Sequence, residues 1–233
     1  MATYYWLPEK NEAIPTEGPA FLMHDDPSGR AQMFHIGIPE RAIIEWARRF
    51  CDKSKTFIDC GAHMGSYSIM LADGFKYVEA IEAQRRTYYQ LCGNIFANEK
   101  YNIHPQNVAI TSHQEANDEV TLSIVSEDGG GSTICETNEK VLKTEIVRTK
   151  SIDSLMPTNV GLIKLDIEGN ELKALKGADW TIKRDKPPII FESNNTPEFP
   201  ERRTELFKYL QTINYSISEI RPFENMYFAE FNQ

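Results

Sequence analysis

Acidic residues that follow short apolar runs are the most reactive recurring groups in this sequence. Asp59 ends the first run, Glu82 the second, Asp166 and Glu168 the third, and Glu192 a fourth. Carboxylates at such places can accept hydrogen bonds from ligand hydroxyls or take up a proton during a reaction. Because the carboxyl ends of parallel strands meet at one edge of a sheet, we expect these acids to share a ligand crevice.

A glycine-bearing turn follows the first acid. Residues 55–73, KTFIDCGAHMGSYSIMLAD, combine an apolar run, a turn with Gly61 and Gly65, and a helix-like segment. This order is typical of a nucleotide-binding βα unit, because glycines let the backbone approach a ligand. The dinucleotide pattern G-x-G-x-x-G is not met, since His63 and Ser66 stand where it needs glycine. An ordinary βα turn is the alternative interpretation.

The second acid lies where a nucleoside ribose is usually bound. Glu82 follows the apolar run 76–81, and an acid about 20 residues past such a turn accepts hydrogen bonds from two ribose hydroxyls. A phosphate would be repelled there, so we predict a nucleoside with a free ribose. Asn107, near the end of the third predicted strand, is placed to bond the adenine amino group. A surface glutamate at a strand end is the alternative for Glu82.

Strand and helix patterns alternate along the chain and predict an α/β fold. We expect a mostly parallel sheet with an antiparallel last strand and helices on both faces. Residues 1–36 form a predicted irregular N-terminal arm with a short hairpin, and residues 37–233 one domain. The third strand is predicted within 101–111, with Pro105 near a sheet edge. A β insertion at about 118–149 either covers the pocket or is a surface hairpin.

Composition restricts the possible partners and location. The chain has 233 residues and a formal net charge of −9, which disfavours a broad electrostatic grip on nucleic acid. None of its four cysteines form a C-x-x-C pair, so free thiols in a reducing compartment are expected. The N-terminal residues do not resemble a signal peptide, and no apolar run approaches the ~20 residues that span a bilayer. These features predict a cytoplasmic protein.

Three stretches resemble the FkbM-type methyltransferases, a family of class I S-adenosylmethionine (SAM) methyltransferases. FIDCGAHMGSYS is similar to the family's VDVGANIGYYS, and IEAQRRTYYQLCGNIFAN to its FEPNPENFELLKENIALN. The most specific match is SIDSLMPTNVGLIKLDIEGNELKALKGA, which resembles TLDDL…LIKIDVEGAELEVLKGA. The resemblance implies a class I Rossmann-like fold and methyl transfer from SAM to oxygen, commonly a hydroxyl of a sugar or secondary metabolite.

The resemblance also implies roles for individual residues. The predicted cofactor-binding residues are Asp59, Gly61, Ala62, Gly65, Ser66, Glu82, Asn107 and Asp166. The turn would cradle the methionine part of SAM, while Asp166 and Glu168 would face the methyl group and the acceptor. Two positions depart from the family pattern: His63 stands where asparagine is usual, and Gln84 where a proline usually follows the acid.

Methyl transfer requires an oriented acceptor oxygen and a group that removes its proton. The predicted catalytic residues are Asp166, Glu168 and His63. Capping of the following helix is the alternative role of Glu168. Glu192 and the arm histidines His24 and His35 are competing bases. Acids at strand ends can also hold a divalent ion, but nothing in the spacing requires one, and we predict no metal.

The predicted function is a SAM-dependent O-methyltransferase acting on a small-molecule or glycan hydroxyl. Two alternatives belong to other classes: an RNA ribose 2'-O-methyltransferase and a non-catalytic nucleoside-binding module. The excess of acidic over basic residues disfavours the RNA enzyme. For the aromatic cluster Tyr4-Tyr5-Trp6 we expect one of three roles: packing onto the domain, lining a substrate pocket, or forming a homodimer contact.

Overall fold

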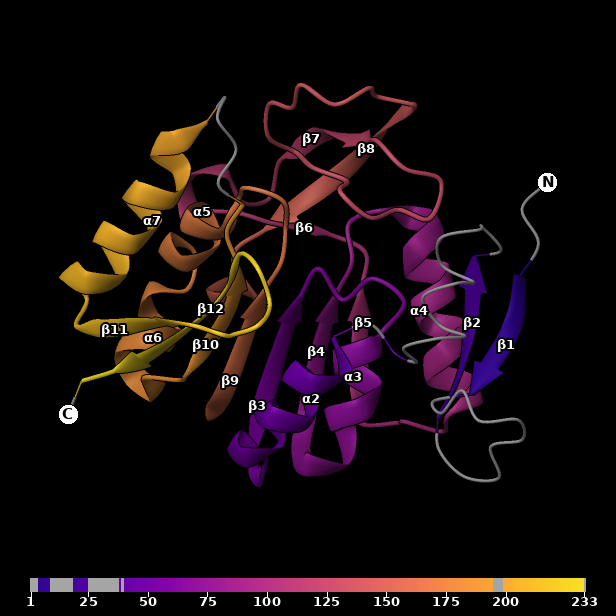
Figure 1. The fold of residues 1–233 in the computed structure, drawn as a ribbon, viewed down its shortest axis with the longest axis horizontal. Coiled ribbons are helices and arrows are strands. Elements are labelled where there is room, and N and C mark those ends of the chain that lie inside the picture. The colour runs from indigo at the N-terminus through magenta and orange to yellow at the C-terminus, as the bar shows by residue number, and fades with distance from the viewer. Residues whose placement is uncertain (1–3, 9–18, 25–37, 39, 195–198, 233) are drawn as a thin grey trace.

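A seven-stranded sheet forms the centre of the computed structural model, which describes residues 4–8, 19–24, 38, 40–194 and 199–232. The strand order is β11-β12-β10-β9-β3-β4-β5 (Figure 1). The strands are β3 (Asp52–Cys60), β4 (Phe75–Ile81), β5 (Ile103–Gln106), β9 (Val160–Leu165), β10 (Ile189–Glu192), β11 (Tyr215–Glu219) and β12 (Met226–Phe231). β12 is antiparallel to both neighbours, whereas β10, β9, β3, β4 and β5 pair in parallel. The predicted mostly parallel sheet with an antiparallel last strand is confirmed.

Helices cover both faces of this sheet. The α-helices are α2 (Arg41–Ala47), α3 (Ser66–Leu71), α4 (Arg85–Ala97), α5 (Glu171–Lys176), α6 (Asp179–Asp185) and α7 (Pro200–Thr212). Single 3-10 turns are η1 (Arg48–Phe50), η2 (Ala72–Gly74), η3 (His113–Glu115) and η4 (Asp153–Leu155). Side chains of α2, α3 and α4 join one hydrophobic cluster, and those of α5, α6 and α7 join another.

The central strands divide their side chains between the two clusters. Phe57 of β3 and Leu162 of β9 pack with α2, α3 and α4, whereas their neighbours Ile58 and Ile163 pack with α5, α6 and α7. Successive side chains of a strand point to opposite faces, so a strand buried on both sides must be apolar almost throughout. This burial holds β3 and β9 side by side and brings their carboxyl ends to the same edge.

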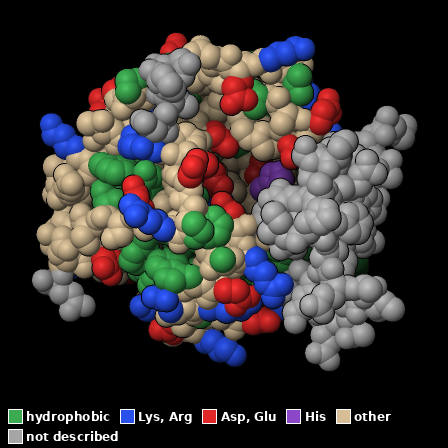
Figure 2. Space-filling model, viewed as in Figure 1, with side chains coloured by type: hydrophobic (Ala, Val, Ile, Leu, Met, Phe, Trp, Pro, Cys, Tyr) green, Lys and Arg blue, Asp and Glu red, His purple; other side chains and the backbone are tan. Residues whose placement is uncertain are grey.

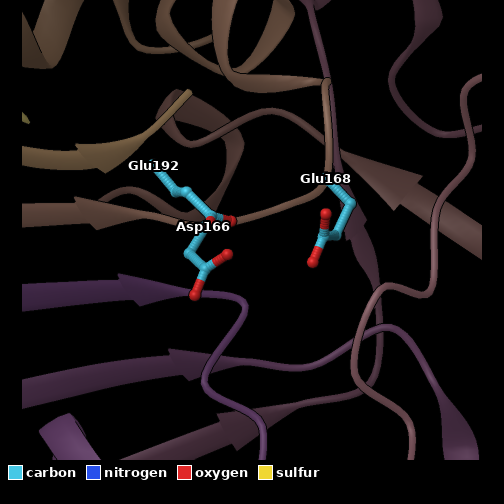
Figure 3. A group of neighbouring side chains, drawn as sticks. All are labelled: Asp166, Glu168 and Glu192. Atoms are coloured by element: carbon cyan, nitrogen blue, oxygen red, sulfur yellow. The ribbon is translucent and has the colours of Figure 1, made fainter. Parts of the chain in front are cut away.

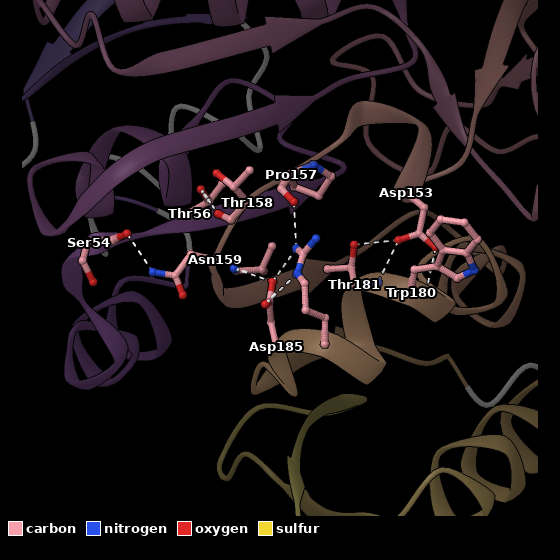
Figure 4. A network of polar contacts seen from close by, with 11 residues as sticks. Ser54, Thr56, Asp153, Pro157, Thr158, Asn159, Trp180, Thr181 and Asp185 are labelled. Atoms are coloured by element: carbon pink, nitrogen blue, oxygen red, sulfur yellow. Dashed lines mark hydrogen bonds and ion pairs between the residues drawn. The ribbon is translucent and has the colours of Figure 1, made fainter.

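Polar contacts fix the opposite, amino ends of β9 and β3 (Figure 4). The Val160 N–H donates to Asp185 Oδ2 over 2.8 Å, and Asn159 Nδ2 donates to the Ser54 carbonyl over 3.0 Å. The Thr56 hydroxyl donates to the Thr158 carbonyl over 2.8 Å. Since the register of β9 is set here, the position of the residues that follow its carboxyl end is set as well.

A small β insertion rises over the carboxyl ends of the parallel strands (Figure 1). It consists of β6 (Ala109–Ile110), β7 (Glu119–Ile124) and β8 (Lys143–Lys150), in the order β6-β8-β7. The predicted third strand is present as β5, which lies within 101–111; the chain then leaves the central sheet and pairs with β8 as β6. Pro105 lies in β5, the edge strand of the central sheet, as predicted.

The N-terminal segment forms a hairpin of β1 (Tyr4–Pro8) and β2 (Ala20–His24). β2 docks on α4, where Asn94 Oδ1 accepts a bond from the Leu22 N–H over 2.5 Å and Gln90 Nε2 donates to the Leu22 carbonyl over 2.7 Å. The predicted hairpin is therefore present, while the boundary at residue 36 lies outside the described residues and stays a prediction. Among the described residues, no helix combines the length and apolarity that crossing a bilayer demands.

Candidate active site

The turn after β3 depends on two glycines. Gly61 has a φ of 78°, and a Cβ at this position would overlap the Asp166 carbonyl oxygen. Gly65 has a φ of 98°, and its Cβ would lie 2.7 Å from Leu91 Cδ1. The N–H groups of Gly61 and Ala62 both donate to the Ile81 carbonyl over 2.9 Å. The turn is thereby fixed against β4 and β9, and Ser66 begins α3 directly behind it.

His63 links the turn to two other parts of the site. Its φ of 51° is left-handed, a conformation in which histidine is less costly than most residues. Its N–H donates to Glu82 Oε2 over 2.9 Å, and its Nε2 lies 3.2 Å from the Asp128 carbonyl oxygen. The backbone of His63 therefore contacts the predicted ribose acid, and its side chain contacts the insertion.

Glu82 is nearly buried at the end of β4. Its Oε2 accepts the His63 N–H, and its Oε1 accepts the Gln84 N–H over 2.9 Å. Burial raises the pKa of Glu82 above its usual value, although the His63 side chain and these two N–H groups oppose the rise. Each carboxylate oxygen has a second lone pair, so the side chain can still accept bonds from a ligand.

Asn107 supports the loop after β4. Its Nδ2 donates to the carbonyls of Glu82 and Ala83, over 2.9 and 2.8 Å. Its side-chain amide hydrogens are thus directed at the backbone, and the cavity wall here contains Val108 and Ala109 instead. The proposed contact of Asn107 with adenine stays a prediction.

A buried lysine ties the turn to the third acidic stretch. Lys164, on β9, donates from Nζ to the Gly61 carbonyl over 2.9 Å and to Asp166 Oδ2 over 3.0 Å. The same Nζ lies 3.8 Å from Asp59 Oδ1, and Asp59 Oδ2 accepts the Ser68 hydroxyl over 2.6 Å. Burial lowers the pKa of Lys164, but the carboxylates of Asp166 and Asp59 raise it by more. The lysine therefore stays charged inside the fold.

Asp59 is completely buried beneath the turn. Burial raises the pKa of Asp59, while Lys164 and the Ser68 bond lower it. Within the described part of the chain, its Oδ1 has no hydrogen-bond partner. Asp59 is not part of the cavity wall. Its position fits a role in holding the turn, and its predicted contact with the cofactor stays untested.

Asp166, Glu168 and Glu192 converge at the edge of the sheet (Figure 3). Each places one carboxylate oxygen within 4.8 Å of the others. Asp166 follows β9, Glu192 ends β10, and Glu168 lies in the turn before α5, with a φ of 55°. Three oxygens this close could also hold a divalent cation, although Asp166 Oδ2 already accepts a hydrogen bond from Lys164 Nζ. The prediction of no metal stays a prediction.

The three carboxyls differ in protonation. Burial raises the pKa of Asp166, but Lys164 and hydrogen bonds lower it by more, so it stays ionised. Burial and the negative charge of Asp166 raise the pKa of Glu168 to about 7 and that of Glu192 to about 9. Like charges this close cannot all ionise at neutral pH. Glu192 therefore carries a proton at pH 7, and Glu168 is half ionised.

Glu171 stabilises the turn before α5, a helix whose N-cap residue, Asn170, makes no side-chain capping hydrogen bond. Glu171 Oε1 accepts the N–H groups of Ile167 and Gly169 over 3.1 and 3.2 Å. The Glu168 carbonyl accepts the Thr133 hydroxyl over 2.7 Å, which joins this turn to the insertion. Among the described residues, no side chain caps α5 with a hydrogen bond, so no contact supports the alternative role of Glu168 as its cap.

A cavity of about 170 Å³ lies where these elements meet. Of the predicted site residues, its wall contains Gly61, His63, Glu82, Asp166 and Glu168. Ala62, Gly65 and Ser66 shape the turn behind it. A cleft of about 880 Å³ adjoins the cavity. In Figure 2, acidic side chains gather around the hollow at the centre of this face, beside a histidine.

The sequence patterns missed two parts of this site. Lys164 is a lysine within the otherwise apolar strand VGLIKL, and this mismatch is the signal that could have found it. Gly129, Gly130 and Gly131 belong to the cavity wall, although the sequence indicated only a turn there. Of the competing bases, His35 lies outside the described residues, and for His24 the structure describes the backbone alone.

Solved methyltransferase structures share the fold. A crystal structure of methyltransferase FkbM from Methylobacillus flagellatus KT has a TM-score of 0.54 at 22% identity, over 77% of this chain and 44% of its own. An O-methyltransferase from Bacillus cereus in complex with SAH has a TM-score of 0.54 at 12% identity, over 88% and 86%. An rRNA methylase from Streptococcus thermophilus has a TM-score of 0.54 at 10% identity, over 85% and 99%. The fold is that of the class I methyltransferases.

The family model described as the methyltransferase FkbM domain matches residues 59–223. The chain belongs to the FkbM methyltransferase family, as the three motifs indicated. It spans less than half the length of the Methylobacillus flagellatus relative. Among curated proteins, none matches this sequence.

Proposed function

We propose that this chain is a SAM-dependent O-methyltransferase whose acceptor is a hydroxyl group of a small molecule or a glycan. The observation that carries the proposal is the meeting of Gly61, Glu82, Asp166 and Glu168 in the wall of one cavity. Family membership supports methyl transfer. The free cysteines fit a reducing compartment such as the cytoplasm.

The residues present fit the cofactor. Gly61 leaves its turn open where any Cβ would strike the Asp166 carbonyl, and Glu82 offers a carboxylate with spare lone pairs to two ribose hydroxyls. Bound SAM would supply a methyl group on a positively charged sulfur. The carboxylate of Asp166, kept ionised by Lys164, favours a positive charge in the cavity that it lines.

The chemistry of the chain's own residues favours an oxygen acceptor. A hydroxyl must lose its proton as its oxygen is methylated, and a carboxylate within reach can take that proton. Glu168 lines both the cavity and the larger cleft, so a group bound in the cleft would meet this carboxylate. With its pKa raised to about 7, Glu168 is a stronger base than an ordinary glutamate. His63, whose Nε2 lies at the Asp128 carbonyl, is the second candidate base.

Calorimetric titration with SAM and with NAD tests the cofactor. We expect SAM to bind the wild-type chain, NAD to have no effect, and Gly61→Val to abolish SAM binding because of the overlap with Asp166. Binding of NAD alone would contradict the proposal. A following assay of methyl release on hydroxyl compounds separates an enzyme from a non-catalytic nucleoside-binding module, which would bind SAM and transfer nothing.

A further inference from the structure

The larger cleft is placed to hold the acceptor. Its volume of about 880 Å³ lies within the range of small-molecule sites. Gly131, Ile134, Glu168 and Asn170 belong to the walls of both the cleft and the cofactor cavity. The rest of the cleft wall comes from residues between 114 and 120, from the segment 133–139, from the start of α5, from Ser193 and Asn194, and from the amino-terminal half of α7. A molecule bound here lies beside the carboxylates of the proposed reaction centre.

Acidic side chains outnumber basic ones in this cleft. Seven acids and two bases belong to its wall. The charge of one base is already balanced, because Lys173 Nζ lies 2.8 Å from Glu115 Oε1. The carboxylate of Glu171 already accepts two backbone N–H groups through Oε1. Leaving these three side chains out, five acids and Arg202 remain.

Arg202 is held by the protein itself. Its guanidinium stacks on Phe199, 3.8 Å from the ring centroid, and Nη2 donates to the Glu136 carbonyl over 3.0 Å. The acids Glu139 and Glu205, in contrast, form no ion pair within the part of the chain that the structure describes. The charge of Glu139 also contributes to the raised pKa of Glu168, after burial, Asp166 and Glu171. The acids of the cleft wall therefore carry more negative charge than its two bases balance.

We infer that the acceptor is a hydroxylated amine, a molecule that presents one hydroxyl to Glu168 and carries a cationic ammonium group deeper in the cleft. This inference rests on the proposed function. A cleft lined by charge of one sign concentrates ligands of the opposite sign and repels those of the same sign. Phosphorylated and carboxylated acceptors are thus disfavoured, and an amino sugar has the matching chemistry.

Cys135 provides a reporter inside this cleft. Its thiol is partly exposed and belongs to the cleft wall. Two methanethiosulfonate reagents of similar size, one carrying trimethylammonium and one sulfonate, can label it, and peptide mass spectrometry separates its rate from those of the other cysteines. Each rate is divided by the rate of the same reagent with free 2-mercaptoethanol. At low salt we expect the cationic reagent to be favoured about tenfold or more, with less preference at high salt.

Charge-neutralising variants identify the source of this preference. Glu139→Gln combined with Glu205→Gln should reduce the preference several-fold. The matched control, Glu201→Gln combined with Glu224→Gln, removes two exposed acids that are not part of the cleft wall, one of them also on α7, and should leave the preference unchanged. Equal labelling by both reagents, faster labelling by the sulfonate, or equal effects of the two double variants would overturn the inference.

Ligand protection tests the acceptor class with defined probes. Glucosamine, glucose and glucuronate share one ring and differ in charge. We expect glucosamine to slow the labelling of Cys135 by neutral iodoacetamide, with a weaker effect of glucose and none of glucuronate. No protection by glucosamine, or equal protection by glucuronate, overturns the inference. SAM titration on the same samples reports separately on the proposed function, because neither Glu139 nor Glu205 belongs to the wall of the proposed cofactor cavity.

Discussion

At the scale of single residues, His63 explains how the turn differs from its relatives. The FkbM pattern usually has asparagine at this position, and here the backbone keeps a left-handed conformation that asparagine and histidine adopt more readily than most residues. The N–H of His63 reaches Glu82 in this conformation. The imidazole then contacts the Asp128 carbonyl and joins the turn to the insertion.

Replacing Glu82 by alanine should weaken SAM binding about ten- to a hundredfold. Hydrogen bonds to a charged group contribute about 1.5–3 kcal/mol, and two ribose hydroxyls would lose their acceptor. The matched control is Glu79→Ala on the same strand, which loses bonds to Gln106 and His104 away from the cavity. Calorimetry on both variants checks this prediction. Equal affinities would show that Glu82 does not contact the cofactor.

Turnover should rise with pH through about 7. Glu168 has a pKa raised to about 7, so it is protonated below that pH and becomes a competent base above it. Glu168→Gln should remove this rise and lower turnover by about 10²–10⁴ while sparing SAM affinity. The measurement is a single-turnover pH profile of both proteins. If the variant keeps the wild-type pH profile, Glu168 is not the base, and His63 becomes the leading candidate.

At the scale of elements, β9 carries the buried Lys164 and leads directly into the turn that holds Glu168 and Gly169. Its burial on both faces leaves room for Lys164 only because three acceptors surround the ammonium group. The chain then turns sharply at Glu168 and Gly169, whose φ values are 55° and 101°. The residue that stabilises the buried strand, Lys164, is therefore separated by only a few positions from the proposed reaction residues Asp166 and Glu168.

Lys164→Met should destabilise the fold by about 3–5 kcal/mol, the usual cost of leaving a buried charge without its partner. Urea denaturation measures the loss. Adding Asp59→Asn should restore part of the stability, because the uncompensated carboxylate is removed as well. Additive losses in the double variant would indicate that the lysine and Asp59 do not interact.

The glycine segment of the insertion should be needed for cofactor binding. Gly129 has a φ of 97°, and a Cβ there would overlap Gln84 Oε1 and Thr87 Oγ1 at the start of α4. Gly129→Ala should therefore displace the cavity wall and weaken SAM binding about tenfold, since a left-handed non-glycine residue costs about 1–2 kcal/mol. At Gly130 the nearest atom would be 3.6 Å away, so Gly130→Ala is the matched control. Similar affinities of both variants would contradict this role.

At the scale of the whole molecule, stability should fall as pH rises from about 5 to 9. Glu168, Glu171 and Glu192 have pKa values raised to about 7, 7 and 9. Above pH 4.5 the unfolded chain loses these protons while the folded chain still holds them, so the folded state binds more protons and loses stability with rising pH. Each ~1 kcal/mol lost lowers Tm by about 2–4 °C in a domain of this size.

Thermal melts across this range check the prediction. Glu192→Gln keeps a neutral side chain at every pH and should flatten the upper part of the curve, between about pH 7 and 9. Glu224→Gln, which replaces an exposed acid, should leave the curve unchanged. A wild-type Tm that rises with pH would contradict the assigned protonation states.

The amino-acid sequence was enough to predict the central strands, the acids at their carboxyl ends and five residues of the cavity wall: Gly61, His63, Glu82, Asp166 and Glu168. Short apolar runs ending in acids identified β3, β4, β9 and β10, because a strand buried on both faces must be apolar and the first polar residue marks its end. The spacing of Gly61 and Glu82 predicted one crevice, since parallel strands present their carboxyl ends together. The motifs that resemble FkbM methyltransferases predicted the family, and the match to the family model confirmed it.

The charge states of the acids, and the contribution of the Gly129 segment to the cavity wall, could be obtained only from the three-dimensional structure. The protonation of Asp166, Glu168 and Glu192 depends on Lys164 and on burial, and neither distance nor desolvation can be obtained from spacing along the chain. The hydrogen bonds of Glu171 likewise depend on the fold of the turn that its carboxylate reaches. Gly129 meets α4 across more than 40 residues of chain, a contact that local patterns do not encode because the folding of the whole sheet brings the two segments together.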